Sequence, residues 1–116
     1  MSTAVVNTPQ DLARRMAALG QRYLQRTVGE LDELQTLVQE VVAGDVATLR
    51  NIEILAHRIR GSGAMFGFEL VSDVAGEIEF LAVDAKLGLH PDRPALRARF
   101  AAQLRVLAFT LRAAAN

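Results

Sequence analysis

The sequence is organised around residues 55–67, which read Leu55-Ala56-His57-Arg58-Ile59-Arg60-Gly61-Ser62-Gly63-Ala64-Met65-Phe66-Gly67. Successive residues of an α-helix lie about 100° apart around its axis. On that wheel the apolar and small residues of this region gather opposite His57; they are Leu49, Ile52, Leu55, Ala56, Ile59, Gly63 and Phe66. The face around His57 carries little bulk and has charge at its edges. We therefore expect a helix with one buried face and an imidazole that stands in solvent.

Two glycines inside this helix reduce its intrinsic stability, because each costs about 1 kcal/mol relative to alanine. Gly63 lies on the buried side, where a missing Cβ lets another helix approach closely. Gly67 stands where a left-handed residue would end the helix. Gly61 has no such explanation, since it lies one turn after His57 on the open face. We interpret Gly61 as keeping the approach of a large group to the imidazole clear.

The residues from His57 to Gly67 resemble the signature of histidine-containing phosphotransfer (HPt) domains. That signature has a histidine, any residue, a hydrophobe, a lysine or arginine, a glycine, often a serine, and a further glycine ten positions after the histidine. The matching residues here are His57, Ile59, Arg60, Gly61, Ser62 and Gly67. Ile59 stands where leucine is more usual and Arg60 where lysine is. Arginine keeps the positive charge but presents it as a planar fork.

This resemblance implies a phosphorelay, in which His57 is the nucleophile that accepts a phosphoryl group from a receiver-domain aspartate and passes it to another receiver. Arg60 would stabilise the phosphoryl charge, and Gly61 would give steric access. Neutral imidazole suits the step, because the ordinary histidine pKa of about 6.5 leaves a free lone pair near neutral pH. The implied partners are response-regulator receiver domains and a hybrid sensor kinase. No cofactor would be bound stably, since the partner receiver domain would supply Mg²⁺.

Partner docking is expected on the shallow face around His57. The residues expected to contribute, besides the site itself, are Arg50, Glu53, Ile54, Arg58, Ala64 and Phe68. A surface of this size suits a weak and transient encounter, as a relay requires. Ser62 points well away from His57 on the helical wheel, so we expect it to serve the helix or a neighbour.

Composition narrows the possible functions. The 116 residues make one domain, and 13 basic residues balance 13 acidic ones, which argues against nucleic-acid or membrane partners. Without cysteine there is no disulfide or thiolate chemistry, and the two histidines have no metal-ligand spacing. No signal peptide, long apolar run or ATP-binding loop is recognisable. We expect a cytoplasmic monomer without ATP-dependent kinase activity of its own.

Apolar residues recur at helical spacing along the rest of the chain, and no alternating strand pattern is present. After a flexible tail at residues 1–8, Thr8 and Pro9 can begin a helix, which Gly20 either ends or bends. Further helices are expected over residues 21–43, 45–66 and 68–86, and a last one after its cap Asp92.

The pair Gly44-Asp45 joins two of these helices so tightly that they should pack antiparallel. We predict an all-α fold, an antiparallel up-down-up-down four-helix bundle with an additional N-terminal helix. Residues 9–116 would form one HPt-like helical bundle domain.

Other features have ordinary structural interpretations. His90 precedes a proline in a loop and reads as a surface residue. Glu77 and Glu79 are two residues apart on a helix and point in different directions, so acid–base work by this pair is not expected. Val106 and Phe109 fall off the main apolar stripe of the last helix, where they form either a wider core face or a self-association patch.

Two competing functions remain open. A non-phosphorylated adaptor or inhibitor could dock a sensor kinase or receiver by shape alone, but it has no use for His57, Arg60 and Gly61 together. A purely structural bundle that self-associates through Val106 and Phe109 leaves Gly61 unexplained. Replacing His57 with glutamine separates these classes, because only a relay needs the imidazole.

Overall fold

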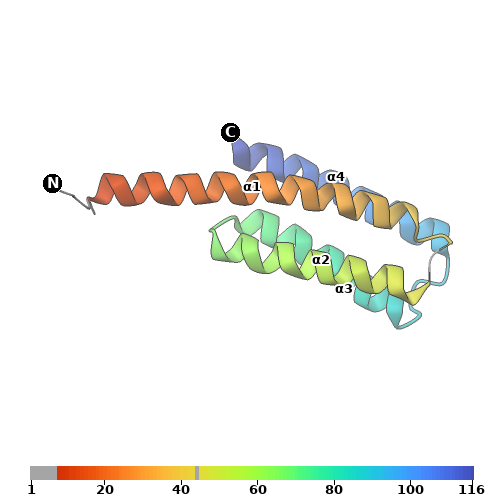
Figure 1. Ribbon diagram of the computed structural model, residues 1–116. Coiled ribbons are helices and arrows are strands. Elements are labelled where there is room, and N and C mark those ends of the chain that lie inside the picture. The colour runs from red at the N-terminus through yellow and green to blue at the C-terminus, as the bar shows by residue number, and fades with distance from the viewer. Residues whose placement is uncertain (1–7, 44) are drawn as a thin grey trace.

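The computed structural model describes residues 8–43 and 45–116. In these residues the chain forms four helices and no strand: α1 (Pro9–Gln39), α2 (Val46–Met65), α3 (Glu69–Lys86) and α4 (Arg93–Ala115). Helices α1 and α3 each pack against both α2 and α4, so the four helices surround one core. Figure 1 shows consecutive helices running in opposite directions. The predicted all-α class is confirmed, and no helix in this part of the chain is long and apolar enough to cross a membrane.

The expected additional N-terminal helix is not a separate element. Helix α1 runs unbroken from Pro9 through Gly20 to Gln39, because one glycine costs only about 1 kcal/mol of helix propensity. Gly20 is buried, and a Cβ there would stand 3.4 Å from the ring of Phe68. The glycine therefore serves a close contact between α1 and the α2–α3 turn.

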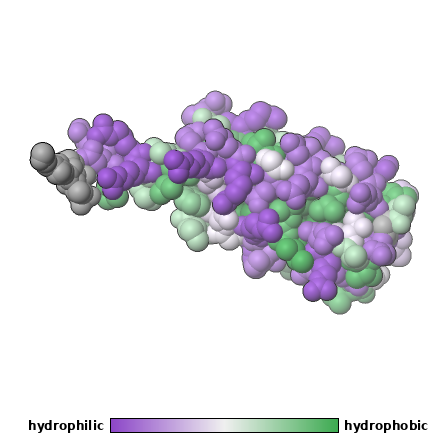
Figure 2. All heavy atoms as spheres, viewed as in Figure 1, coloured by the Kyte–Doolittle hydropathy of each residue, from purple (hydrophilic) through white to green (hydrophobic). Residues whose placement is uncertain are grey.

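The first turns of α1 project past the other three helices in Figure 1. On the face shown in Figure 2, this projection carries mostly hydrophilic residues with hydrophobic ones between them. Leu12, Met16 and Leu19 are exposed there because no other helix reaches them. Val106 and Phe109 of α4 are exposed as well, so they do not widen the core face of that helix.

Side-chain caps begin three of the helices at the expected places. In each case an oxygen of the capping residue accepts a hydrogen bond from a backbone N–H of the first turn, at 2.9–3.1 Å. The caps are Thr8 for α1, Asp45 for α2 and Asp92 for α4. Gly67 has φ +81° after the end of α2, the left-handed conformation expected of it.

Helix α1 ends at Gln39, four residues before the predicted end at residue 43. Residues 40–43 form turns instead, and Val41 still reaches the core from there. The predicted cap at Gly44 lies outside the described residues. The predicted flexible tail at residues 1–8 also lies outside them, except for Thr8.

The closest packing in the bundle joins α2 to α3. Small buried residues line the contact: Ala56 and Gly63 on α2, and Ala75 and Ala82 on α3. A Cβ on Gly63 would stand 3.1 Å from the backbone nitrogen of Ser72 and 3.3 Å from the carbonyl oxygen of Phe68. The expectation that Gly63 permits a close helix approach is confirmed.

Tyr23 joins α1 to the end of this helix pair. Its buried ring stacks on Phe66 and on Phe68, with ring centroids 5.3 Å apart in both cases. Its hydroxyl donates a hydrogen bond to the carbonyl oxygen of Ile59 at 3.3 Å. Burial raises the pKa of the Tyr23 phenol, because the ionised form would lose its hydration.

Tyr23 is the only tyrosine of the chain, so the near-ultraviolet absorbance of its phenolate reports its pKa directly. We expect ionisation at a higher pH in the folded protein than in the urea-unfolded protein. Above pH ~10 the unfolded chain loses a proton that the folded chain retains, so stability falls as pH rises through the folded pKa. The free energy of unfolding should fall more steeply there for wild type than for Tyr23→Phe. Equal titration of the folded and unfolded protein would contradict this.

Candidate functional site

His57 lies in the middle of α2, on the side away from the core. Its side chain is 63% exposed, as expected from the helical wheel. The opposite side of α2 is buried and consists of Leu49, Ile52, Leu55, Ala56, Ile59 and Gly63. The bundle therefore holds the backbone of His57 firmly while its ring remains accessible to another protein.

A carboxylate from α3 holds the imidazole. The Nδ1 atom of His57 lies 2.8 Å from Oε2 of Glu79. An ionised carboxylate only accepts hydrogen bonds, so Nδ1 carries the proton and donates it. In the neutral ring, Nε2 then keeps a free lone pair. Glu79 is well suited to fix this tautomer, because its side chain is only 16% exposed.

Glu79 is absent from the site residues predicted from the sequence. The prediction that Glu77 and Glu79 point in different directions is confirmed, since Glu77 is exposed and Glu79 turns toward α2. The sequence contains one indication that Glu79 belongs to the site, namely the face of α3 on which it lies. Ala75 and Ala82 flank it at helical spacing and are both buried. An acidic residue in such a buried stripe needs a partner, which here is His57.

Arg60 follows His57 by one turn of α2 and completes a three-residue cluster. Its Nε atom lies 3.0 Å from Oε1 of Glu79, and its Nη2 atom lies 3.4 Å from Nδ1 of His57. Guanidinium groups only donate hydrogen bonds, and Nδ1 already donates to Glu79. The second approach is therefore a close contact that places a positive charge beside the ring.

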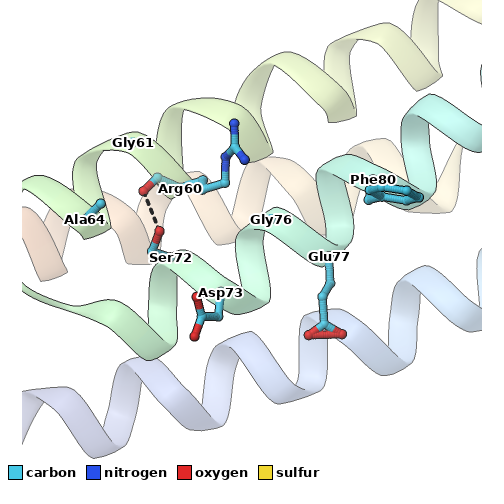
Figure 3. A pocket seen from close by; sticks show the side chains of 8 residues that line it. All are labelled: Arg60, Gly61, Ala64, Ser72, Asp73, Gly76, Glu77 and Phe80. Atoms are coloured by element: carbon cyan, nitrogen blue, oxygen red, sulfur yellow. Dashed lines mark hydrogen bonds between the residues drawn. The ribbon is translucent and has the colours of Figure 1, made fainter.

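Helix α3 also determines where the Arg60 side chain lies. A Cβ on Gly76 would stand 3.1 Å from Cδ of Arg60, so the glycine makes room for the aliphatic part of that side chain. One turn earlier on α3, the Ser72 hydroxyl donates a hydrogen bond to the Arg60 carbonyl oxygen at 2.8 Å (Figure 3). These contacts fix Arg60 against α3 at both its backbone and its side chain.

A groove of about 720 Å³ lies between α2 and α3 beside this cluster. Figure 3 shows the residues that line it, which are Arg60, Gly61, Ala64, Ser72, Asp73, Gly76, Glu77 and Phe80. A Cβ on Gly61 would meet no heavy atom within 4 Å. No packing contact therefore requires glycine at this position, which agrees with its interpretation as an open approach.

The expected docking residues occupy different environments. Arg50, Ile54 and Ala64 are exposed, and Ala64 lines the groove. Arg58 lies 3.5 Å from the buried carboxylate of Glu30 on α1.

The side chains of Glu53 and Phe68 contact other residues of the domain. Glu53 forms an ion pair with Lys86 of α3. The ring of Phe68 stacks on Tyr23 and packs against the core, and the residue is partly buried and also lines a separate groove beside α4. The hydroxyl of Ser62 donates to the carbonyl oxygen of Arg58 at 2.9 Å and so serves its own helix.

Among residues 8–43 and 45–116, no group of three or more His, Asp and Glu side chains could hold a metal ion.

The family model of the Hpt domain matches residues 9–113 of the chain. The chain belongs to the Hpt domain family. Hpt domains perform histidine phosphotransfer in phosphorelays, where they interact with receiver domains. The match covers nearly the whole of the four helices and confirms the resemblance noted in the sequence. No curated protein and no solved structure matches the chain.

Alanine substitutions at two glycines of this Hpt domain should change stability in opposite directions. Gly61→Ala meets open space and improves helix propensity, so the free energy of unfolding should rise by up to about 1 kcal/mol. Gly63→Ala would crowd the Tyr23 hydroxyl at 3.0 Å, the backbone nitrogen of Ser72 in α3 and the carbonyl oxygen of Phe68, so the free energy of unfolding should fall by about 1–3 kcal/mol. Urea denaturation measures the free energy of unfolding of both variants.

If Gly61 keeps the approach to the imidazole clear, Gly61→Ala should also accept phosphoryl groups more slowly than wild type. An unchanged rate of phosphoryl acceptance would contradict that role.

Proposed function

We propose that this Hpt domain carries a phosphoryl group on Nε2 of His57. The phosphoryl group comes from the aspartyl phosphate of one receiver domain and passes to the aspartate of another. The observation that carries the proposal is the 2.8 Å contact between Nδ1 of His57 and Glu79, on a ring that is 63% exposed. This contact commits Nδ1 as a donor and leaves Nε2 as the nucleophile. The proposal includes the cytoplasmic location expected from the sequence.

The proposed phosphoryl transfer needs no dedicated general base. The lone pair of Nε2 attacks phosphorus, and a P–N bond forms while the P–O bond to the receiver aspartate breaks. The electron pair of the broken bond leaves with the aspartate carboxylate. The Nδ1 proton stays in its hydrogen bond to Glu79, so positive charge that develops on the ring faces a carboxylate. The same step in reverse delivers the phosphoryl group to a second receiver, with Mg²⁺ supplied by the receiver domain.

Arg60 would counter the negative charge of the phosphoryl oxygens as they arrive at and leave His57. Its Nε atom is held by Glu79 at 3.0 Å, while Nη2 stays 3.4 Å from the imidazole. A planar guanidinium can contact the carboxylate through one nitrogen and face the ring with another, which an ammonium group cannot do in the same geometry. An adaptor that docks by shape alone would need none of these contacts.

Phosphoryl transfer to His57→Gln tests the proposal. Receiver domains phosphorylated with acetyl phosphate in the presence of Mg²⁺ should label wild type with a phosphoryl group that has the acid lability of phosphohistidine. His57→Gln should remain unlabelled, because glutamine has no nucleophilic lone pair on nitrogen. His90→Gln, at the other histidine of the chain, is the matched control and should be labelled like wild type. Labelling of His57→Gln, or loss of labelling in His90→Gln, would refute the assignment.

Glu79→Gln tests the role of the carboxylate as a positioning group. Glutamine keeps the size of the side chain but loses its charge, so transfer should slow by about tenfold, the equivalent of one charge-assisted hydrogen bond. Nitrogen-15 NMR of the imidazole should show the proton leaving Nδ1 in part of the population. Glu69→Gln, on the exposed start of the same helix, should change neither measurement. A slower rate with an unchanged tautomer would assign Glu79 a structural role only.

A further inference from the structure

We propose that the acidic edge of the α2–α3 groove, formed by Asp73 and Glu77, selects receiver domains that present an apolar side chain flanked by lysine or arginine. The same edge would set the orientation in which such a receiver docks over His57. This inference rests on the proposed function, because it concerns the partner of the same site.

The groove offers an apolar contact next to the nucleophile. Its α2 side includes Gly61 and Ala64, which have little bulk, and Gly76 continues that low surface on α3. Phe80 borders the groove and is 69% exposed. An exposed aromatic ring beside small residues suits an apolar side chain of a partner, since aromatic anchors dominate the energetics of interfaces.

Asp73 and Glu77 add a negative charge to one side of this groove only. Both are exposed and four residues apart on α3, where like charges repel each other. In the part of the chain that the structure describes, neither carboxylate takes part in an ion pair. Figure 3 shows both projecting from α3 on the side away from Arg60. A positively charged partner group would relieve the repulsion and neutralise the edge.

The surrounding sequence reinforces this negative edge. Helix α3 contains five acidic residues and a single basic one, Lys86, at its last position; the acidic residues are Glu69, Asp73, Glu77, Glu79 and Asp84. Lys86 pairs with Glu53 of α2, and Glu79 is occupied by His57 and Arg60. Among the charged residues that line the groove, Arg60 is paired with Glu79, whereas Asp73 and Glu77 have no ion-pair partner in the described residues. The net charge of the lining is therefore negative although the whole chain is neutral.

The position of this edge explains how it would orient a receiver. Glu79 stands beside His57. Along the helix axis Glu77 lies only about 3 Å from Glu79, whereas Asp73 lies about 9 Å away, so Asp73 supplies most of the asymmetry along the groove. A receiver must bring its aspartyl phosphate to His57 and Arg60, whose guanidinium attracts it. The carboxylates of the receiver site would be repelled if they approached Asp73 and Glu77 instead. A receiver with a basic flank can then dock in only one of the two directions along the groove.

Charges at the rim of an interface act mainly on the association rate and its salt dependence. The combined substitution Asp73→Lys with Glu77→Lys should therefore lower kcat/KM for transfer by about tenfold at low salt. The probe is a purified receiver domain, phosphorylated with acetyl phosphate, that labels the wild-type protein. The difference in kcat/KM between this variant and wild type should shrink as salt rises from about 50 mM to 500 mM. At the higher concentration the Debye length is shorter than the distance over which the two carboxylates would attract the receiver.

A matched control separates the edge from the overall charge. Asp32→Lys on α1 with Glu40→Lys directly after its end makes the same change in net charge on exposed residues, and it should leave kcat/KM near the wild-type value. Exchange of a flanking lysine or arginine of the receiver for glutamate should restore transfer to the α3 variant. Circular dichroism of each variant checks that the helices are intact.

The outcomes distinguish this inference from the proposed function. If the α3 variant is labelled as fast as wild type while His57→Gln is not labelled, the acidic edge has no role and the relay stands. If the α1 control loses as much rate as the α3 variant, net charge is responsible and the inference is overturned. If no receiver labels wild type, the proposed function and this inference fail together.

Discussion

The close contact between α2 and α3 is the constraint on which the site depends. Gly63 allows the two backbones to approach, since a Cβ there would lie about 3 Å from Ser72 and from Tyr23. That approach brings Glu79 of α3 within 2.8 Å of His57. Core packing and site geometry are thus consequences of the same small residues.

Glu79 links this packing to the chemistry. A largely buried carboxylate is costly unless it is paired, and here its two oxygens face His57 and Arg60 at 2.8 and 3.0 Å. The pairing serves both residues, because it fixes the imidazole tautomer and holds the guanidinium beside the ring. One side chain of α3 therefore positions the imidazole of His57 and the guanidinium of Arg60, both of which come from α2.

The chain has no net charge, but its charged side chains are unevenly distributed over the surface. The chain has equal numbers of acidic and basic residues, so its formal net charge is zero. Within the folded domain, however, Arg60 and the exposed carboxylates of Asp73 and Glu77 lie on opposite sides of one groove. Such a local separation of charge can direct a transient partner without strengthening its binding greatly. That property matches a carrier that has to release each partner after transfer.

Spacing along a single helix was enough to predict much of this protein. The exposed His57, the buried face opposite it, the close approach at Gly63 and the left-handed Gly67 all follow from the geometry of one helix. Capping side chains likewise predicted where three helices begin. Gly20 could not be interpreted in this way, because whether a glycine ends a helix depends on what packs on the following turns.

Contacts between helices were decided only by the tertiary structure. The pairing of His57 with Glu79 spans 22 residues, and the seating of Arg60 on Gly76 spans 16. Phe68 stacks on Tyr23, which lies 45 residues away in the sequence. Periodicity determines which face of each helix is apolar. It does not determine the axial register and rotation of one helix against another, because these depend on how side chains from separate segments pack together.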